Sequence, residues 1–355
     1  MKYIIDFNSD KPAYLQLYIR LRDDITKCVY KFGDKLPSKR NICDKAGVSV
    51  ITAEHAYAIL CDEGYAEARQ RSGYFVTYKT SDFFPVANYK KHELSKINHT
   101  INDEFFSYNS FAKTARAVLS EYGEELFEKS PTFGCDYLKN SLSEYLARSR
   151  GINVDTKQIV IGAGAEYLYS LIVQILQKNK YALENPSYNK IEKVYRANGV
   201  ECEFLKMGKD GILSKELEKC DAPVLHVTPF NSFPSGISAS ASKRHEYINW
   251  AEKNDRIIIE DDFSSEFSVS VKSEDTLFSL SENVIYLNTF SKTIAPSVRV
   301  GYMLLPKNKC DEFLKRIDFY SCTVSLYEQY IIAELLSGGI FERHINRIRR
   351  KLRKK

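Results

Sequence analysis

The residue best suited to covalent chemistry in this 355-residue sequence is a lysine that follows an apolar run. Lys292 comes shortly after Val284–Leu287, within the segment Thr289–Gly301. A strand that ends in this way can hold the amine at the mouth of a cavity, where desolvation lowers its pKa and leaves it free to form a Schiff base. Arg299 lies seven residues further on and offers a planar fork for a phosphate group.

Other segments carry complementary chemistry. Residues 159–166 pass from an apolar run through glycines into a helical pattern, Tyr167–Leu176, whose first backbone N–H groups would bind a phosphate. The run Ile257–Ile259 continues into acidic residues, and a carboxylate there could pair with a protonated pyridine nitrogen. Tyr188 could stack on the face of an aromatic ring. These are the parts that a pyridoxal 5′-phosphate site needs.

Residues of this kind need a sheet whose strands end at one edge. From about residue 110 onward, apolar β-rich runs alternate with amphipathic helical stretches. Strands separated by helices indicate a mostly parallel sheet with crossover helices, which is an α/β layer fold. The predicted strands are Gln158–Ile161, Tyr181–Leu183, Val224–Val227, Arg256–Ile259, Val284–Leu287 and Val300–Leu305.

The first 77 residues have a different pattern and predict a helix-turn-helix. Ser38 can cap a helix that runs toward Ala46, and Gly47 can take the positive φ that ends it. Ser49 can cap a second helix, whose apolar residues recur at spacings of three and four and therefore share one face. These apolar residues are Ala53, Ala56, Tyr57 and Leu60.

A predicted hairpin over residues 65–76 follows and completes a winged helix with a basic tip. The layout suits double-stranded DNA, because a recognition helix puts its first residues into the major groove and the wing meets backbone phosphates. Arg40 could reach a phosphate or a guanine edge, and Gly73 permits close approach of the wing. The candidate DNA-binding residues are Ser38, Arg40, Ser49, Val50, Ile51, Thr52, Arg69, Arg71 and Gly73.

The composition is that of a soluble protein of two domains. The chain is 44% hydrophobic and 27% charged, which excludes a disordered or fibrous protein. No apolar run approaches the roughly 20 residues that cross a bilayer, so no membrane association is expected. The eight cysteines form no Cys-x-x-Cys pair and fit a reducing cytoplasm, while the six histidines do not cluster, so no metal site is predicted. The polar segment 78–104 is a predicted linker between domains 1–77 and 105–355.

Residues 11–77 resemble the winged-helix domain of the GntR family of bacterial regulators. The matching residues are Pro12, Tyr14, Gln16, Gly33, Leu36-Pro37-Ser38-x-Arg40, Gly47-Val48-Ser49, Thr52, Ala56-Tyr57-x-x-Leu60, Glu63-Gly64-Tyr65 and Ser72-Gly73-x-Phe75-Val76. Val50 stands where the family usually carries an arginine, which removes a phosphate or base contact.

The sequence from about residue 105 to the end resembles the fold-type I aminotransferase-like domain of the MocR subgroup of this family. Besides the segments named above, the matching stretches include Gly134, Leu138, Tyr145-Leu146, Arg150-Gly151, Thr228-Pro229, Phe233-Pro234 and Gly236. The resemblance implies that Lys292 forms the Schiff base with pyridoxal 5′-phosphate and that Asp261 pairs with the pyridine nitrogen. It implies that the phosphate is held by Arg299, Gly164 and Ala165, with help from Thr289 or Ser291.

The sequence departs from the subgroup at several points. Phe263 replaces a tyrosine whose hydroxyl bonds the 3′-oxygen of the cofactor, and Asn231-Ser232 replaces a His-Gln pair. Family members also continue beyond an arginine-rich helix like the one predicted over residues 344–355, and form a small domain that grips a substrate carboxylate. We expect that small domain to be truncated or absent here.

These features predict a cytoplasmic, homodimeric transcriptional regulator in which a DNA-binding winged helix is joined to a domain that binds pyridoxal 5′-phosphate. Binding of the cofactor, or its displacement by an amine effector, would favour one spacing of the paired wings over another. One alternative is a pyridoxal-phosphate-dependent aminotransferase, against which the missing small domain argues. Another is a regulator that binds DNA but no longer binds the cofactor.

Overall fold

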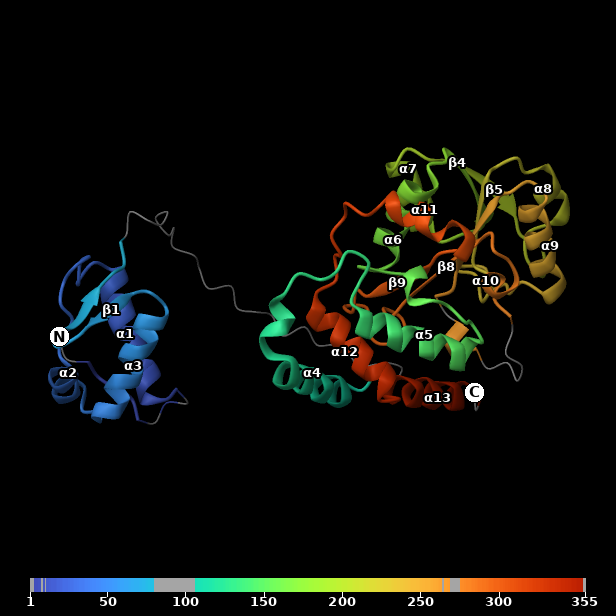
Figure 1. Cartoon of the computed structure of the whole chain (residues 1–355). Helices are drawn as coiled ribbons and strands as arrows, with labels where there is room; N and C mark the ends of the chain where they lie inside the picture. Colours follow the sequence, from blue (N-terminus) through green and yellow to red (C-terminus); the bar gives the residue numbers. More distant parts are fainter. Residues whose placement is uncertain are drawn as a thin grey trace. The chain divides into compact units, whose positions relative to one another are not determined.

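The computed structural model describes residues 3–7, 9, 11–79, 106–263, 265–268 and 275–353. The described residues form two units, one up to residue 79 and the other from residue 106 (Figure 1). Of the predicted linker 78–104, residues 80–104 lie outside the described residues, so the linker stays a prediction. Within the ranges given above, the longest apolar stretch of any helix is too short to cross a membrane.

The first unit contains a helix-turn-helix followed by a hairpin, as predicted. Strands β1 and β2 pair antiparallel, with Ala66 opposite Val76 and Arg69 opposite Gly73. The apolar face predicted for the second helix of the motif is fully buried and packs on the helix that precedes the motif. The elements are α1 (Ala13–Thr26), α2 (Lys39–Ala46), α3 (Val50–Asp62), β1 (Ala66–Arg69) and β2 (Gly73–Val76).

The second unit is built on a seven-stranded sheet among its described residues, with the order β3-β9-β8-β7-β6-β4-β5. The strands from β4 to β8 run parallel to their neighbours, whereas β9 is antiparallel to both β8 and β3. The mostly parallel α/β fold is therefore confirmed. The strands are β3 (Ile159–Gly162), β4 (Lys180–Asn185), β5 (Glu201–Lys206), β6 (Val224–Val227), β7 (Ile257–Asp261), β8 (Val284–Thr289) and β9 (Gly301–Leu304).

Helices cover both faces of this sheet, which explains why the strands read as continuous apolar runs rather than as alternating ones. The helices are α4 (Tyr108–Tyr122), α5 (Asp136–Arg150), α6 (Ala165–Leu176), α7 (Asn189–Ala197), α8 (Ser214–Lys219), α9 (Ala241–Glu252), α10 (Leu277–Leu280), α11 (Cys310–Lys315), α12 (Leu326–Ser337) and α13 (Ile340–Leu352). Short 3₁₀ turns occur at η2 (Gly123–Phe127), η3 (Thr156–Gln158), η4 (Ser265–Phe267) and η5 (Lys307–Lys309).

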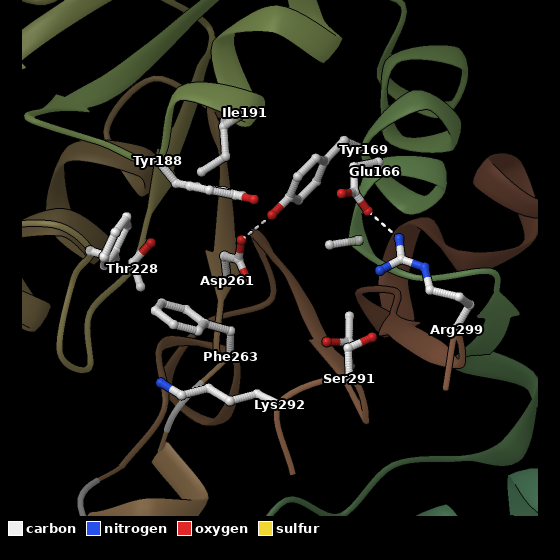
Figure 2. A pocket seen from close by; sticks show the side chains of 13 residues that line it. Glu166, Tyr169, Tyr188, Ile191, Thr228, Asp261, Phe263, Ser291, Lys292 and Arg299 are labelled. Atoms are coloured by element: carbon white, nitrogen blue, oxygen red, sulfur yellow. Dashed lines mark hydrogen bonds and ion pairs between the residues drawn. The ribbon is translucent and has the colours of Figure 1, made fainter. Parts of the chain in front are cut away.

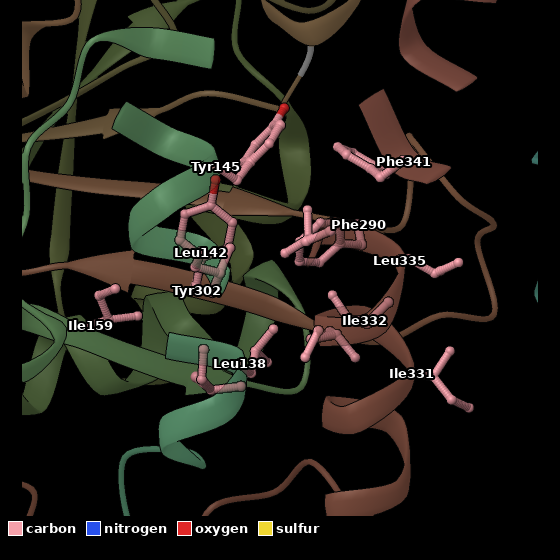
Figure 3. Close-up of a cluster of buried hydrophobic side chains, with 14 of the residues drawn as sticks. Leu138, Leu142, Tyr145, Ile159, Phe290, Tyr302, Ile331, Ile332, Leu335 and Phe341 are labelled. Carbon is pink, nitrogen blue, oxygen red and sulfur yellow. The ribbon is translucent and has the colours of Figure 1, made fainter. Parts of the chain in front are cut away.

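Alternate residues of β8 show how the layers are divided. Val284 and Tyr286 face one side of the sheet. Val284 packs in a core with residues of α8, α9 and α10, and Tyr286 packs in a core with residues of α5, α12 and α13. Ile285 and Leu287 face the opposite side, which α6, α7 and α11 cover (Figure 1). Figure 3 shows the cluster beneath α5, α12 and α13, in which Phe290 and Tyr302 belong to one apolar core with side chains of the three helices.

The direction of the strands places the chemistry. Strands β3, β4, β6, β7 and β8 all run the same way, so their carboxyl ends meet at one edge of the sheet. Because β9 runs in the opposite direction, its amino end lies at that same edge. The segment 290–300, which joins β8 to β9, therefore stays at this edge, and a backbone hydrogen bond from Phe290 N to Val300 O (2.9 Å) closes it. Ligands of open α/β sheets bind at such an edge.

Candidate functional sites

Serine side chains begin both helices of the helix-turn-helix. Ser38 Oγ accepts a hydrogen bond from Asn41 N, and Ser49 Oγ accepts one from Thr52 N, both at 3.2 Å. Gly47 ends the first helix at φ +69°. The predicted caps are therefore confirmed, and each satisfies a backbone donor that the helix itself leaves unpaired.

The first turn of α3 presents apolar side chains to solvent. Val50 is 49% exposed and Ile51 is 78% exposed, although large apolar side chains are usually buried. The opposite face of the same helix is in the core, and Tyr57 there donates a hydrogen bond to Pro37 O (2.6 Å). The helix is therefore held with its first residues outward, in the orientation that insertion into a major groove requires.

The basic residues around this helix differ in their surroundings. On the wing, Arg69 pairs with Glu67 (Nη2 to Oε1, 2.7 Å) and lies over the Phe75 ring, with its guanidinium carbon 4.4 Å from the ring centre. Arg71 is exposed in the turn between β1 and β2, where it takes a positive φ of 59°. Arg40 is exposed on α2. Gly73 has φ +111°, and a Cβ there would lie 3.1 Å from Lys35 Cε.

In the second unit, a cavity of about 440 Å³ opens at the carboxyl edge of the sheet. This volume is in the range of sites for small molecules and cofactors. Six of the residues that line it were not predicted as cofactor-binding residues, and these are Glu166, Tyr169, Ile191, Thr228, Phe233 and Phe263 (Figure 2). All the predicted cofactor-binding residues except Gly164 line it, and these are Ala165, Tyr188, Asp261, Thr289, Ser291, Lys292 and Arg299.

Three consecutive acidic residues at the end of β7 have three different environments. Asp261 alone lines the cavity. Glu260 accepts hydrogen bonds from Leu277 N (3.1 Å) and Phe278 N (2.9 Å) at the start of α10, and burial raises its pKa to about 8. Asp262 points to the opposite side, as alternation along a strand requires, and pairs there with Arg150 (2.9 Å). Of the three carboxylates, only that of Asp261, the residue to which the resemblance assigns the pyridine nitrogen, therefore faces the cavity.

A chain of buried polar groups holds Asp261. The hydroxyl of Tyr169 donates to Asp261 Oδ2 (Figure 2), and His226 Nε2 lies 3.5 Å from the same oxygen. The other ring nitrogen of His226, Nδ1, is 2.7 Å from the Tyr195 hydroxyl. All of these side chains are buried, and the hydrogen bond from Tyr169 fixes the orientation of the carboxylate, whereas His226 Nε2 faces it without a hydrogen bond.

The amine of Lys292 lies against an aromatic ring. Its Nζ is 4.4 Å from the centre of the Phe263 ring, and Figure 2 shows the side chain extended alongside that ring. Partial desolvation at the pocket lowers the pKa of the Lys292 amine, while the charge of Glu266 acts in the opposite direction. At a given pH, a larger fraction of the Lys292 amine is therefore neutral and nucleophilic than in a fully hydrated lysine.

Arg299 stands at the start of α6, as expected for an anion-binding arginine, but a carboxylate already pairs with it. The Arg299 guanidinium contacts Glu166 Oε2 (Figure 2), and Glu166 Oε1 lies 3.0 Å from Lys190 Nζ. A Cβ built on Gly164 would lie 2.6 Å from Arg299 Nη2, so only a glycine leaves room for the guanidinium in this position. Gly164 thus shapes the site from just outside the cavity wall.

The remaining predicted residues, Tyr188, Thr289 and Ser291, also line the cavity. Tyr188 and Phe233 form an edge-to-face pair with ring centres 6.0 Å apart. Thr289 N donates to Asn288 Oδ1 (2.6 Å). The hydroxyl of Ser291 donates its proton to Val298 O (2.8 Å), so in this arrangement it has no proton left for a phosphate oxygen.

Sequence reasoning did not find Tyr169, which lines the cavity, or His226 and Tyr195, which approach Asp261 from outside the cavity lining. Tyr169, His226 and Tyr195 carry no recognisable motif, and their roles depend on how α6, α7 and β6 meet in space. Glu166 directly follows the glycine turn predicted to bind a phosphate. Its negative charge at that position was the signal in the sequence that could have identified it as a competitor for the anion site. Phe233 was noted only as part of a matching stretch.

Comparison with known proteins covers nearly the whole chain. The family described as "Bacterial regulatory proteins, gntR family" matches residues 13–76. The uncharacterized HTH-type transcriptional regulator YdeL of Bacillus subtilis is 31% identical over 98% of this chain and 78% of its own length. The HTH-type pyridoxine biosynthesis transcriptional regulator PdxR of Corynebacterium glutamicum is 28% identical, over 98% of this chain and 79% of its own length. The probable rhizopine catabolism regulatory protein MocR of Rhizobium meliloti is 25% identical, over 98% and 76%.

Solved structures of aminotransferases share the fold of the second unit. An archaeal alanine:glyoxylate aminotransferase superposes with a TM-score of 0.62 at 22% identity, over 68% of this chain and 63% of the enzyme. LysN, the alpha-aminoadipate aminotransferase of Thermus thermophilus, gives 0.61 at 23% identity, over 70% and 65%. The chain therefore spans less than two thirds of these enzymes, and at this identity the likeness establishes the fold alone.

Proposed function

This chain belongs to the MocR subgroup of the GntR family of bacterial transcriptional regulators, and we propose that its aminotransferase-like unit binds pyridoxal 5′-phosphate as the signal that controls DNA binding. In this proposal residues 1–77 form the DNA-binding domain, 78–104 the linker and 105–355 the cofactor-binding domain. The regulator acts in the cytoplasm, where its operator DNA lies, and it acts as a homodimer, because two wings can read two half-sites.

The observation that carries the proposal is the convergence of Lys292, Asp261 and Arg299 on one cavity. These residues come from three different places in the sequence, and each has the chemistry for one part of the cofactor. The cavity volume of about 440 Å³ suits a ligand of this size. A Cβ on Gly164 would lie 2.6 Å from Arg299 Nη2, so the glycine lets the guanidinium lie against the start of α6, and this placement supports an anion-binding role for Arg299. The residues present therefore fit the cofactor.

When bound, the cofactor supplies an aldehyde and a ring that withdraws electrons. Lys292 would hold the aldehyde covalently, and Asp261 would keep the ring nitrogen protonated, with the hydrogen bond from Tyr169 fixing the carboxylate. Tyr188 would cover one face of the ring. Arg299, the backbone at Gly164 and Ala165, and Thr289 would hold the phosphate, and Ser291 would join them only by releasing Val298 O.

The DNA-binding side of the proposal rests on the first turn of α3 and on the wing. Val50, Ile51 and Thr52 would meet base edges, and Ser49 would bring a hydroxyl close to the backbone. Ser38 and Arg40 at the start of α2, with Arg69, Arg71 and Gly73 on the wing, would meet phosphates. Cofactor binding, or displacement of the cofactor by an amine effector, would shift the population toward one arrangement of the two wings.

Covalent trapping tests the cofactor half of the proposal. The full chain is incubated with pyridoxal 5′-phosphate, reduced with borohydride and digested, and the labelled peptide is identified by mass spectrometry. We expect the label on Lys292, its loss in Lys292→Ala, and its retention in the control Lys253→Ala, whose lysine is exposed at the end of α9. An unlabelled chain that still binds DNA would identify a regulator that has lost its cofactor.

A gel-shift titration tests the regulatory half. Promoter DNA is titrated with the full chain in the presence and absence of pyridoxal 5′-phosphate. We expect a change in affinity or footprint that disappears in Lys292→Ala. Equal affinity and an identical footprint under both conditions would contradict the proposed switch. Turnover of an amino acid and a keto acid in the same preparation, abolished by Lys292→Ala, would identify an enzyme instead.

A further inference from the structure

The anion site of the cavity is already engaged by a carboxylate of the chain itself. We propose that Glu166 is a specificity-determining residue that competes with a ligand phosphate for Arg299, so that a phosphorylated ligand binds only by displacing Glu166 onto Lys190. The inference rests on the proposed function, because it assigns the phosphate of the ligand to this part of the cavity. It concerns a position at which this chain places a negative charge inside a site built for an anion.

The contacts define the competition. Glu166 lies in the first turn of α6, where backbone N–H groups and the helix dipole favour a negative charge. One oxygen of its carboxylate contacts Arg299 and the other lies 3.0 Å from Lys190 Nζ. The guanidinium of Arg299 is packed against Gly164, so it faces the helix start that a phosphate would also use. Carboxylate and phosphate therefore require the same donors.

Glu166 remains charged wherever the protein is folded at ordinary pH. Partial burial disfavours the carboxylate, but hydrogen bonds from Lys190, from its own backbone N–H and from Arg299 outweigh this and lower the pKa of Glu166 to about 2. A phosphate that approaches Arg299 thus meets a permanent like charge. The chain cannot remove that charge by protonation, and it can only move the side chain.

Lys190 provides the destination for that movement. It lies in the first turn of α7, two residues after Tyr188, and its Nζ is 5.9 Å from the centre of the Tyr188 ring. When a phosphate takes Arg299, Glu166 keeps Lys190 as its partner and stays neutralised. The exchange links the phosphate end of the cavity to the aromatic residue proposed to cover the ring, because both contact Lys190. A ligand without a phosphate gains nothing from the exchange and leaves the ion pair with Arg299 in place.

The test measures anion binding directly, with Glu166→Gln in the full chain purified in phosphate-free buffer. Glutamine keeps the size and one acceptor oxygen but removes the charge. Calorimetric titration with inorganic phosphate is expected to show binding on the order of fivefold tighter in Glu166→Gln than in the parent chain, which corresponds to the loss of one partly exposed like charge. The affinity for pyridoxal, which has no phosphate, is expected to be unchanged.

The matched control is Glu192→Gln. Glu192 pairs with Arg196 on α7 (2.8 Å), so this change also removes one ion-paired carboxylate, but at a position that does not line the cavity. It is expected to leave phosphate affinity unaltered. Thermal melting of all three chains shows whether each is folded.

Equal or weaker phosphate binding by Glu166→Gln would overturn the inference, and would indicate that Glu166 orients Arg299 instead of competing for it. Undetectable phosphate binding by both chains would overturn it as well. If Lys292 cannot be trapped but Glu166→Gln still strengthens phosphate binding, the cofactor assignment fails while the competition stands. Trapping on Lys292 with no effect of Glu166→Gln has the opposite meaning, so the two failures are distinguishable.

Discussion

The Lys292 amine lies 4.4 Å from the centre of the Phe263 ring, so the residue proposed to hold the cofactor rests on the residue that replaces the tyrosine of the subgroup. An aromatic face in this position interacts favourably with a cation but offers no hydrogen bond. The chain therefore keeps the shape of the pocket at position 263 and gives up one polar contact to the ligand.

Restoring that hydroxyl should strengthen the retention of pyridoxal 5′-phosphate. In Phe263→Tyr the added hydroxyl can donate to the 3′-oxygen of the cofactor, and a single hydrogen bond to a charged group corresponds to roughly a tenfold gain. Retention is measured as the fraction of cofactor left after dialysis. Phe263→Leu lacks the hydroxyl and serves as the control. Equal retention by the tyrosine and leucine variants would contradict the explanation.

The reaction of Lys292 with the cofactor should depend on pH in a defined way. Only the neutral amine attacks an aldehyde, and desolvation lowers the pKa of Lys292 below the ordinary lysine value of 10.5. The rate of cofactor incorporation, followed by absorbance, should therefore rise with pH to a plateau, and the midpoint of this rise should lie below pH 10.5. A midpoint at or above that value would show that the pocket does not favour the neutral amine.

Glu184 should make the fold less stable as pH rises. It is buried near the end of β4, where it accepts a hydrogen bond from the Ser232 hydroxyl (2.6 Å). Burial raises the pKa of Glu184 to about 8, whereas the unfolded chain has the ordinary value of 4.5. The folded state thus holds a proton that the unfolded state has lost between these pH values, so stability falls across this window.

Glu184→Gln should remove that loss of stability. Glutamine keeps an acceptor for Ser232 and cannot ionise, so the variant should be more stable than the parent at pH 8 by a few kcal/mol, roughly 1.4 kcal/mol for each unit of the raised pKa. At pH 4 the two chains should melt at similar temperatures. Thermal melts from pH 4 to pH 8 give the comparison. A variant that melts below the parent at pH 8 would refute the prediction.

Gly164→Ala should disable the anion site. Its Cβ would lie 2.6 Å from Arg299 Nη2, so the guanidinium must leave the start of α6 and phosphate affinity should fall by roughly tenfold, the loss of one charge-assisted contact. Gly199→Ala provides the control, because Gly199 has a similar φ of +79° but no atom within 4 Å of its Cβ position. Gly164 also has ψ 177°, a backbone region that only glycine adopts readily, so thermal melting first shows that each variant is folded before the phosphate affinities are compared. Equal phosphate binding by the two would contradict the role of Gly164.

Ile51→Ala should weaken DNA binding without affecting the fold. Ile51 is 78% exposed, so it contributes little to the core, and an apolar side chain at the start of a recognition helix is suited to the methyl group of thymine. We expect a loss of about 1 kcal/mol in DNA affinity, the value of a buried methylene or methyl contact. A binding site is first selected from random DNA, and its thymines are then replaced by uracil.

The parent chain should lose affinity for the uracil-containing site, and Ile51→Ala should be insensitive to the replacement. Val29→Ala, at another exposed apolar position of the first unit, is the control for a simple change in surface. If the parent chain binds both DNAs equally, no thymine methyl is read.

The features predicted from sequence were those that depend on local chemistry. Ser38 and Ser49 cap their helices because a serine before an apolar periodic segment has few other roles. Lys292 and Asp261 line the same cavity because one follows a strand of the parallel sheet closely and the other ends such a strand. The sequence also predicted that β9 is a strand, but not that it runs antiparallel between β3 and β8, since that depends on the order in which distant strands pair.

The contacts that the site residues make could not be predicted from the sequence either, because they too depend on how distant elements pack. His226 reaches Asp261 only because β6 is the neighbour of β7, and Glu166 reaches Lys190 only because α6 packs on α7. Such relationships join residues tens of positions apart and leave no spacing in the sequence. The residue types involved are common, and only the tertiary structure shows that they lie next to each other.

The closed segment 290–300 carries both Lys292 and Arg299 on a single short stretch of backbone. Insertion or deletion of one residue within it would misplace the amine and the guanidinium together. In the proposed regulator, a single change of length in this segment would therefore disable the cofactor site in one step and leave the DNA-binding unit intact.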